Sequence, residues 1–265
     1  MDAGIVTNEN YFTRPIMAAY WSVSQFKDFM KCQAAALASV RGEYEREDTT
    51  ALLVGSYVDA YFSGEMEEFR AKHPAIYNTR TGELKADYKK ADEIIERVKA
   101  EPLMMEFLTG ETQVIKTAEL FGVPWKIKID VLHPDKIVDL KVVKDFNPIY
   151  EEGHGRRSWV AYWGYDIQGA IYQEVERIAS GRAEPLPFYL VAVTKEKVPD
   201  VAILQIPQPI LDDALALVKH KIDELDLVKM GDIPATRCGH CDYCKRTKHI
   251  TAPAVYDPDA LEAII

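Results

Sequence analysis

Two aspartates and a lysine lie close together in the stretch WKIKIDVLHPDKIVDLKVVKD, residues 125–145. The segment HPDK, residues 133–136, suits a tight turn with proline at its second position. If this turn pairs its first residue with its last, Asp130 on one strand lies directly opposite Asp139 on the other. Strand alternation then places Asp130, Asp139 and Lys141 on one face of the hairpin, and the Ile, Val and Leu side chains on the other.

This arrangement can be interpreted as a metal site or as an ordinary amphipathic hairpin. Carboxylates directly opposite each other lie about 4.5–5.5 Å apart at Cβ and repel, unless one is protonated, solvent screens them or a cation sits between them. Oxygen ligands of this kind suit Mg²⁺ or Mn²⁺, and Lys141 lies where it could position or deprotonate a water or stabilise a phosphate. The pattern therefore predicts metal-dependent phosphodiester cleavage, while an amphipathic hairpin with one apolar face and one wet, charged face remains the alternative.

The cysteines form a second group with chemical potential. The chain contains four of them, Cys32, Cys238, Cys241 and Cys244. The spacing of the last three suits one face of a [4Fe–4S] cluster, for which only Cys32 is left as fourth ligand. Zinc is the alternative, with Cys32, His240 or His249 completing the site; free cysteines or a thiol–disulfide enzyme are two further readings. Either metal would join the first long helix to the C-terminal segment (about 232–249), stabilising the fold by about 4 kcal/mol on loop-closure grounds.

Hydrophobic periodicity predicts the elements that position these residues. Strands are expected within 112–132, as a hairpin that turns near Gly122, around the 133–136 turn, and within 187–197 and 200–207. Helices are expected at 24–40, 50–64, 85–101, 158–181 and 209–230, whereas 65–84 and 147–158 read as irregular. Helices that flank a central group of strands indicate the α/β (α+β) class.

Two predicted helices carry polar side chains that need an explanation. Tyr165, Gln168 and Tyr172 are spaced so that they share one helix face, which indicates either packing or a role beside Lys141 or the substrate backbone. Asp59 stands in an otherwise apolar helix, where a buried carboxylate without a partner is costly. We therefore expect Asp59 to lie at an exposed edge or to bind something.

Composition limits the classes of function. The 265 residues indicate one domain with additions, 1–265, and no apolar run approaches the ~20 residues of a membrane span. The N-terminus lacks the pattern of a secretory signal, so we expect a cytoplasmic protein with no membrane partner. A net charge of −10 argues against non-specific nucleic-acid binding over the whole surface, but leaves room for local basic tracks within 126–144 and 237–248.

Taken together, these residues resemble the PD-(D/E)xK nuclease superfamily, and more closely its RecB- and RecE-like exonucleases. The resemblance rests on short motifs that cover most of the chain. They are Asp130 with Asp139-Leu140-Lys141, the QxxxY-like Gln168 and Tyr172, the GxxxH-like segment Gly55 to Asp59 with Asp in place of His, the acidic Glu111, and Ser22-Val23-Ser24 followed by Cys32.

The resemblance implies a restriction-endonuclease-like central mixed sheet flanked by helices. It implies a Mg²⁺- or Mn²⁺-dependent exonuclease of linear DNA, with catalytic residues Asp130, Asp139, Lys141, Gln168 and Tyr172, and with metal ligands at Asp59, Glu111, Asp130 and Asp139. It also implies that the four cysteines bind a cluster as in the iron–sulfur branch. The implied biological role is phage-type recombination beside a single-strand annealing protein, and the resemblance is compatible with a homo-oligomer. Two alternatives stay open: a nucleic-acid-binding module on an inactive nuclease fold, and a flap- or spacer-trimming iron–sulfur nuclease.

Overall fold

The elements of the fold come from a computed structural model, which describes residues 4–45, 47–151 and 153–253. The ends of the predicted domain, 1–3 and 254–265, lie outside the described residues. The helices are α1 (Arg14–Ala19), α2 (Val23–Lys31), α3 (Gln33–Arg41), α4 (Thr50–Ser63), α5 (Met66–Lys72), the 3₁₀ helix η1 (Pro74–Ile76), α6 (Ala86–Lys99), α7 (Pro102–Phe107), α8 (Trp159–Tyr162), α9 (Tyr165–Ala179), α10 (Gln208–Met230) and α11 (Asp242–Arg246). The strands are β1 (Glu111–Leu120), β2 (Val123–Leu132), β3 (Ile137–Val143), β4 (Ile149–Glu151), β5 (Gly155–Arg157), β6 (Phe188–Thr194) and β7 (Val201–Gln205).

Five strands form one mixed sheet in the order β1-β2-β3-β6-β7. Only the β3–β6 pair is parallel, and the long connection between these two strands contains α8 and α9. The other three pairs are antiparallel neighbours along the chain. The predicted class, a central mixed sheet flanked by helices, is confirmed.

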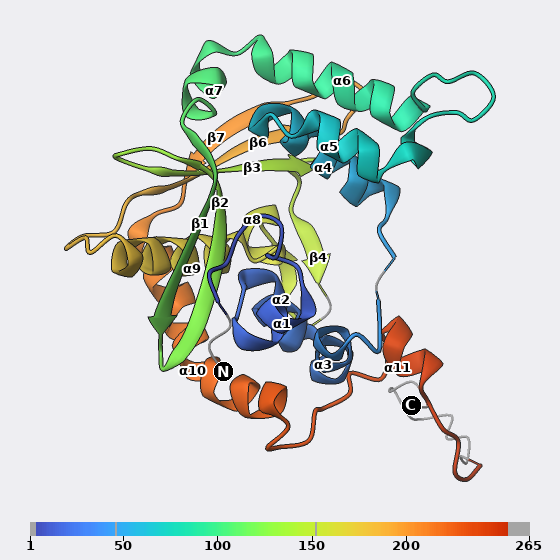
Figure 1. Ribbon diagram of the computed structural model, residues 1–265, viewed down its shortest axis with the longest axis vertical. Coiled ribbons are helices and arrows are strands. Elements are labelled where there is room, and N and C mark those ends of the chain that lie inside the picture. Colours follow the sequence, from blue (N-terminus) through green and yellow to red (C-terminus); the bar gives the residue numbers. More distant parts are fainter. Residues whose placement is uncertain (1–3, 46, 152, 254–265) are drawn as a thin grey trace.

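Both faces of the sheet are buried, because helices pack on each side (Figure 1). One core lies between the sheet and α2, α3, α9 and α10. The other lies between the sheet and α4 to α7. On β6, Leu190 and Ala192 belong to the first core, whereas Val191 and Val193 belong to the second. The central strands are therefore apolar on both faces, as in a sheet with helical layers on either side.

Two predicted single helices are each broken in two. Residues 24–40 form α2 and α3, separated at Cys32, whose backbone is extended (φ −161°, ψ 104°). Ser22 caps α2 by accepting a hydrogen bond from the Gln25 amide. Residues 158–181 form α8 and α9, separated at Gly164, which adopts φ 64°. The sequence did not predict either break, because the hydrophobic period continues through both positions. Cys32 is itself a candidate metal ligand, and Gly164 directly precedes Tyr165.

Several short elements were not predicted. Helices α5 and α7 and the 3₁₀ helix η1 lie at residues expected to be irregular or to end a helix, and β4 and β5 form a small hairpin within 147–158. Each is too short to show a clear hydrophobic period. Among the described residues, no helix has the length and apolar character needed to cross a membrane.

Gly169 is where α9 comes closest to the sheet and to α10. A Cβ at this position would lie 2.5 Å from Phe188 Cδ1 and 2.9 Å from Leu211 Cδ2. We expect Gly169→Ala to lower the free energy of unfolding by about 1–3 kcal/mol, because overpacking outweighs the gain in helix propensity.

Gly55 in α4 provides the matched control, since a Cβ there would have no neighbour within 4 Å. Gly55→Ala should raise the free energy of unfolding by about 0.5–1 kcal/mol. Urea unfolding of both variants measures the difference, and equal effects at the two positions would contradict the packing argument.

Candidate active site

The β2–β3 hairpin has the predicted register. Val131 pairs with Val138 and Leu132 with Ile137, and the turn closes with a 2.9 Å hydrogen bond from His133 N to Lys136 O. The backbone ladder ends after these two pairs. Beyond it, the strands are linked by a side chain instead: the amide of Leu140 donates to Asp130 Oδ2 at 2.9 Å. Asp130 therefore lies against β3 at the point where the two strands separate.

Asp139 is fully buried, so the charged face of the hairpin is not wet. Its Oδ1 accepts a 2.6 Å hydrogen bond from Gln168 Nε2 on α9, and its Oδ2 forms an ion pair with Lys141 Nζ. Oδ2 accepts no hydrogen bond with good geometry within the described part of the chain. The alternative interpretation, a hairpin with one apolar and one solvated face, does not hold at Asp139, because α9 covers this residue.

The surroundings of Lys141 strongly favour its charged form. Burial lowers the pKa of Lys141, but the carboxylates of Asp139 and Asp130 outweigh that effect and raise it above its usual range. The ammonium also lies 5.2 Å from the centre of the Tyr165 ring. A second lysine, Lys27 of α2, lies nearby, and burial together with the charge of Lys141 lowers its pKa to about 8.

Asp59 and Asp130, both partly buried, join Asp139 in a group of carboxyl groups around Lys141. Burial raises the pKa of Asp130 well above its usual range, and the negative charges of Asp139 and Asp59 raise it further. Burial also raises the pKa of Asp59 to about 6, despite the opposing effect of Lys141. Asp59 lies in α4, so the group draws on helices from both layers and on two strands of the sheet.

Tyr165, Gln168 and Tyr172, which the sequence predicts to share one face of α9 (the α9 stripe), lie on the side of the helix that faces this group. Gln168 holds Asp139, and Tyr165 faces Lys141. The hydroxyl of Tyr172 donates a 2.8 Å hydrogen bond to the backbone carbonyl of Lys128 on β2. The stripe thus braces both strands of the hairpin from one helix.

An open cavity of about 390 Å³ gives access to the group. It is lined by Tyr11, Phe12, Ser22, Val23, Ser24, Lys27, Ser56, Asp59, Glu65, Gln113, Lys128, Asp130, Gln168 and Tyr172. Glu111 does not belong to this lining and is exposed at the start of β1. Lys27, Glu65 and Gln113 were missed by sequence reasoning. The signal for Glu65 is its place directly after Gly64, which ends α4, the helix that carries Asp59.

The donor set fits a divalent cation by its chemistry. Asp59, Asp130 and Asp139 supply the hard oxygen ligands that Mg²⁺ and Mn²⁺ prefer, and their mutual repulsion is what a bound cation would relieve. The ligand atoms of these three carboxylates lie farther apart than the four thiol sulfurs. Of the side chains that the structure describes, only the four cysteines have ligand atoms that all lie within 4.8 Å of one another.

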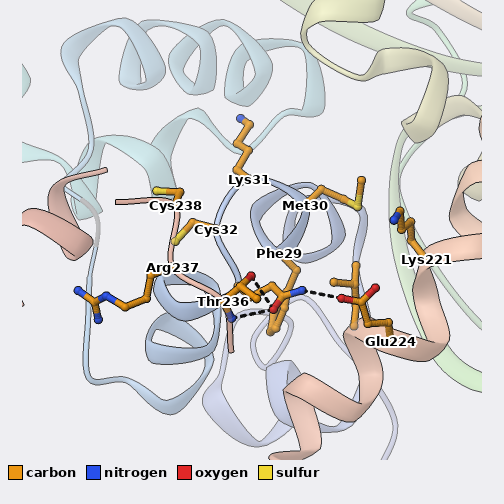
Figure 2. A pocket seen from close by; sticks show the side chains of 11 residues that line it. Phe29, Met30, Lys31, Cys32, Lys221, Glu224, Thr236, Arg237 and Cys238 are labelled. Carbon is orange, nitrogen blue, oxygen red and sulfur yellow. Dashed lines mark hydrogen bonds between the residues drawn. The ribbon is translucent and has the colours of Figure 1, made fainter. Parts of the chain in front are cut away.

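The four cysteines meet at one point, although more than 200 residues separate the first from the last. Cys32 Sγ lies 3.6 Å from Cys244 Sγ and 3.8 Å from Cys241 Sγ, and Cys238 Sγ lies 3.9 Å from Cys244 Sγ. Figure 2 shows Cys32 and Cys238 next to each other on the α2–α3 break and the C-terminal segment. His240 is exposed, with its ring at the backbone carbonyl of Cys238.

The C-terminal segment is also held beside the thiols by a polar side chain of α3. Gln33 Oε1 accepts hydrogen bonds from the amide and the hydroxyl of Thr236, each 2.8 Å long, and Gln33 Nε2 donates to Glu224 of α10 (Figure 2). Four converging thiols can bind a metal ion, and the break at Cys32 explains how a helical segment presents its thiol to the C-terminal ones.

Comparison with known proteins agrees with this geometry. A family model described as a PDDEXK-like domain of unknown function (DUF3799) matches residues 22–247. The chain is similar to a candidate exonuclease from Eubacterium rectale with a crystal structure: the two are 39% identical, with a TM-score of 0.91 over 95% of this chain and 97% of the other. No curated protein matches the chain.

Proposed function

Because the chain belongs to the PDDEXK-like family DUF3799, we propose that it is a Mg²⁺- or Mn²⁺-dependent nuclease that removes nucleotides from the ends of linear DNA. The observation that carries this proposal is the position of Asp139 and Lys141. They form an ion pair on one strand, and Asp130, Asp59 and Gln168 surround them beside an open cavity.

Each residue has a distinct role in the proposal. Asp59, Asp130 and Asp139 hold the cation, and Gln168 keeps the Asp139 carboxylate in place. When bound, the cation lowers the pKa of water and neutralises charge on the phosphate. Lys141 positions the attacking water or donates to the phosphate as negative charge builds on it. Tyr172 acts on the position of β2 through the Lys128 carbonyl, and Glu111 takes no part because it is exposed outside the cavity.

The neighbouring structure favours an exonuclease over the alternatives. The similar protein from Eubacterium rectale is described as an exonuclease candidate, over nearly the full length of both chains. An inactive DNA-binding module is disfavoured, since Asp139, Lys141 and Gln168 retain their mutual contacts. A role in phage-type recombination beside a single-strand annealing protein belongs to the same proposal and rests on the resemblance of the motifs.

The proposed activity is tested with DNA of two topologies. Purified protein is incubated with end-labelled linear duplex and with covalently closed circular DNA, each with Mg²⁺ and with a chelator. We expect mononucleotides or short oligonucleotides from the linear DNA in Mg²⁺, and intact circles throughout. Cleavage of the circle would show an endonuclease, and intact linear DNA in both Mg²⁺ and Mn²⁺ would overturn the proposal.

Cation binding should be visible as thermal stabilisation. Binding at 100 times the dissociation constant stabilises the native state by about 2.7 kcal/mol, and each kcal/mol raises Tm by roughly 2–4 °C for a chain of about this size. Mn²⁺ should therefore raise the Tm of the parent by several degrees, as measured by calorimetry.

Asp130→Asn is the informative variant for this measurement. The amide keeps an oxygen for the Leu140 N–H but removes a charge that burial and two neighbouring carboxylates disfavour. Without metal, the variant should melt no lower than the parent, and it should lose most of the shift with Mn²⁺. A full shift in Asp130→Asn would exclude this carboxylate as a ligand.

For the four cysteines, we propose a single zinc ion in place of the [4Fe–4S] cluster that the motif spacing favours. A tetrahedral ion with Zn–S bonds of about 2.3 Å places its sulfurs about 3.8 Å apart, which matches the separations of 3.6, 3.8 and 3.9 Å. In a cluster, each thiolate binds its own iron at a corner of a cube, so the thiolates stand farther apart than around one ion. The site lies outside the lining of the cavity, which supports a structural role.

A further inference from the structure

Gln113 has an unusual backbone conformation for a residue inside a strand. Its φ is +55°, in the left-handed region that non-glycine residues seldom occupy. The other described non-glycine residue with positive φ is Phe121 (φ 54°), which forms the two-residue β1–β2 turn with Gly122, where such angles are required. Gln113 has no turn to explain it, so its strain is retained for another reason.

The strain interrupts the β1–β2 ladder at one position. Thr112 pairs with Val131 and Val114 with Ile129, but Gln113 and Asp130, which stand opposite each other between these pairs, are not paired. The interruption also changes the faces of β2, since Ile129 packs in the core of α9 and α10 while Val131 packs in the core of α4 to α7. The distorted position therefore coincides with the proposed metal ligand Asp130.

The side chain of Gln113 adds a second unfavourable feature. Its amide nitrogen Nε2 is buried and has no hydrogen-bond partner among the described residues. Gln113 lines the cavity that also contains Asp59, Asp130 and Gln168. A buried donor without an acceptor is costly, so one residue combines a strained backbone with an unsatisfied amide at the same cavity.

We propose that Gln113 is a substrate-binding residue whose amide donates a hydrogen bond to a phosphate oxygen of the DNA strand. An NH₂ group cannot bind a cation, and it supplies a donor where carboxylates otherwise dominate. Glutamine side chains commonly contact phosphate oxygens, and such contacts position a strand without reading its sequence. This inference rests on the proposed nuclease function and names one contact between that site and its substrate.

A set of substitutions separates the amide from the backbone. Gln113→Gly removes the amide and relieves the positive φ, so it should fold at least as stably as the parent in urea unfolding. Gln113→Ala removes the amide and keeps the strain. Gln205→Gly makes the same chemical change in the exposed end of β7, on the opposite edge of the sheet, and serves as the matched control.

Two readouts are measured on each variant: kcat/KM on end-labelled linear DNA in Mg²⁺, and the dissociation constant for the same DNA by fluorescence anisotropy in Ca²⁺. We expect Gln113→Gly and Gln113→Ala to lower kcat/KM and to weaken binding by roughly tenfold or more, the size of a hydrogen bond to a charged group. Gln205→Gly should match the parent in both. The two Gln113 variants should resemble each other, because both lack the amide.

The outcomes distinguish this inference from the nuclease proposal. Parent-like cleavage and binding by Gln113→Gly, with loss only in Gln113→Ala, would mean that Gln113 acts through its backbone and would overturn the inference while leaving the nuclease intact. If the parent binds DNA but does not cleave it, the nuclease proposal fails, and the binding constants still decide on Gln113. A parent that neither binds nor cleaves DNA overturns both.

Discussion

Replacing Lys141 with alanine should reduce DNA cleavage by about 10²–10³-fold or more, the usual effect of removing a group that stabilises developing charge. The loss should fall on kcat, because the ammonium acts on the transition state more than on the bound substrate. Steady-state kinetics on end-labelled linear DNA in Mg²⁺ measures it. Activity within tenfold of the parent would remove Lys141 from the proposed mechanism.

The ion pair with Asp139 makes a stability control necessary. Removal of one partner of a buried pair leaves an uncompensated charge and costs about 3–5 kcal/mol in typical cases, although Gln168 still binds Asp139 in the variant. Circular dichroism and thermal melting should show Lys141→Ala folded at the assay temperature. Lys136→Ala, in the turn of the same hairpin, should keep parent activity, because its ammonium lies against Asp135 and the Phe107 ring.

Cys32→Ala should lose the bound metal as completely as Cys241→Ala, despite the distance between the two residues in the sequence. Both thiols belong to one group of four converging cysteines, so the double variant should be little less stable than either single variant. The expected loss of stability is about 4 kcal/mol from loop closure alone. Metal and acid-labile sulfide are measured on protein purified without oxygen, and urea unfolding is measured on the same samples.

The identity of the ion follows from the same samples. One zinc per chain, colourless protein and no sulfide would support the single-ion proposal. Iron with sulfide and absorbance near ~400 nm would show a cluster instead. His240→Ala and His249→Ala are the controls and should keep a full complement of metal, because the four thiols already supply four ligands to the proposed zinc ion. Retention of metal in Cys32→Ala, together with loss of metal in His240→Ala, would contradict the proposal that the four cysteines bind the ion.

The central hairpin could be predicted because local chemistry specifies it. The His133-Pro134-Asp135-Lys136 turn sets the register, and alternation sets the face of Asp139 and Lys141. The sequence could not show that the ladder ends after two pairs. That depends on the carboxylate of Asp130 reaching the Leu140 N–H and on α9 covering the charged face, and both are contacts between distant segments.

Other features escaped prediction for the same reason. The break at Cys32 lies within a periodic helical pattern, and the extended backbone there is explained only by the thiols that arrive from the C-terminal segment. Gln113 stands in an ordinary strand sequence, and nothing local predicts a positive φ. Glu111 has the expected charge but lies outside the cavity, whereas Gln113, two residues later, lines it.

The most direct measurement is the rate of nucleotide release from end-labelled linear DNA as a function of Mn²⁺ concentration, for the parent and for Asp139→Asn. The account predicts a saturable dependence on the cation in the parent, no release in chelator, and a loss of at least about 10²-fold in the variant, since Asp139 would both bind the cation and anchor Lys141. Release that persists in chelator, or an Asp139→Asn rate equal to that of the parent, would contradict the proposal that this group of carboxylates and lysine is the nuclease site.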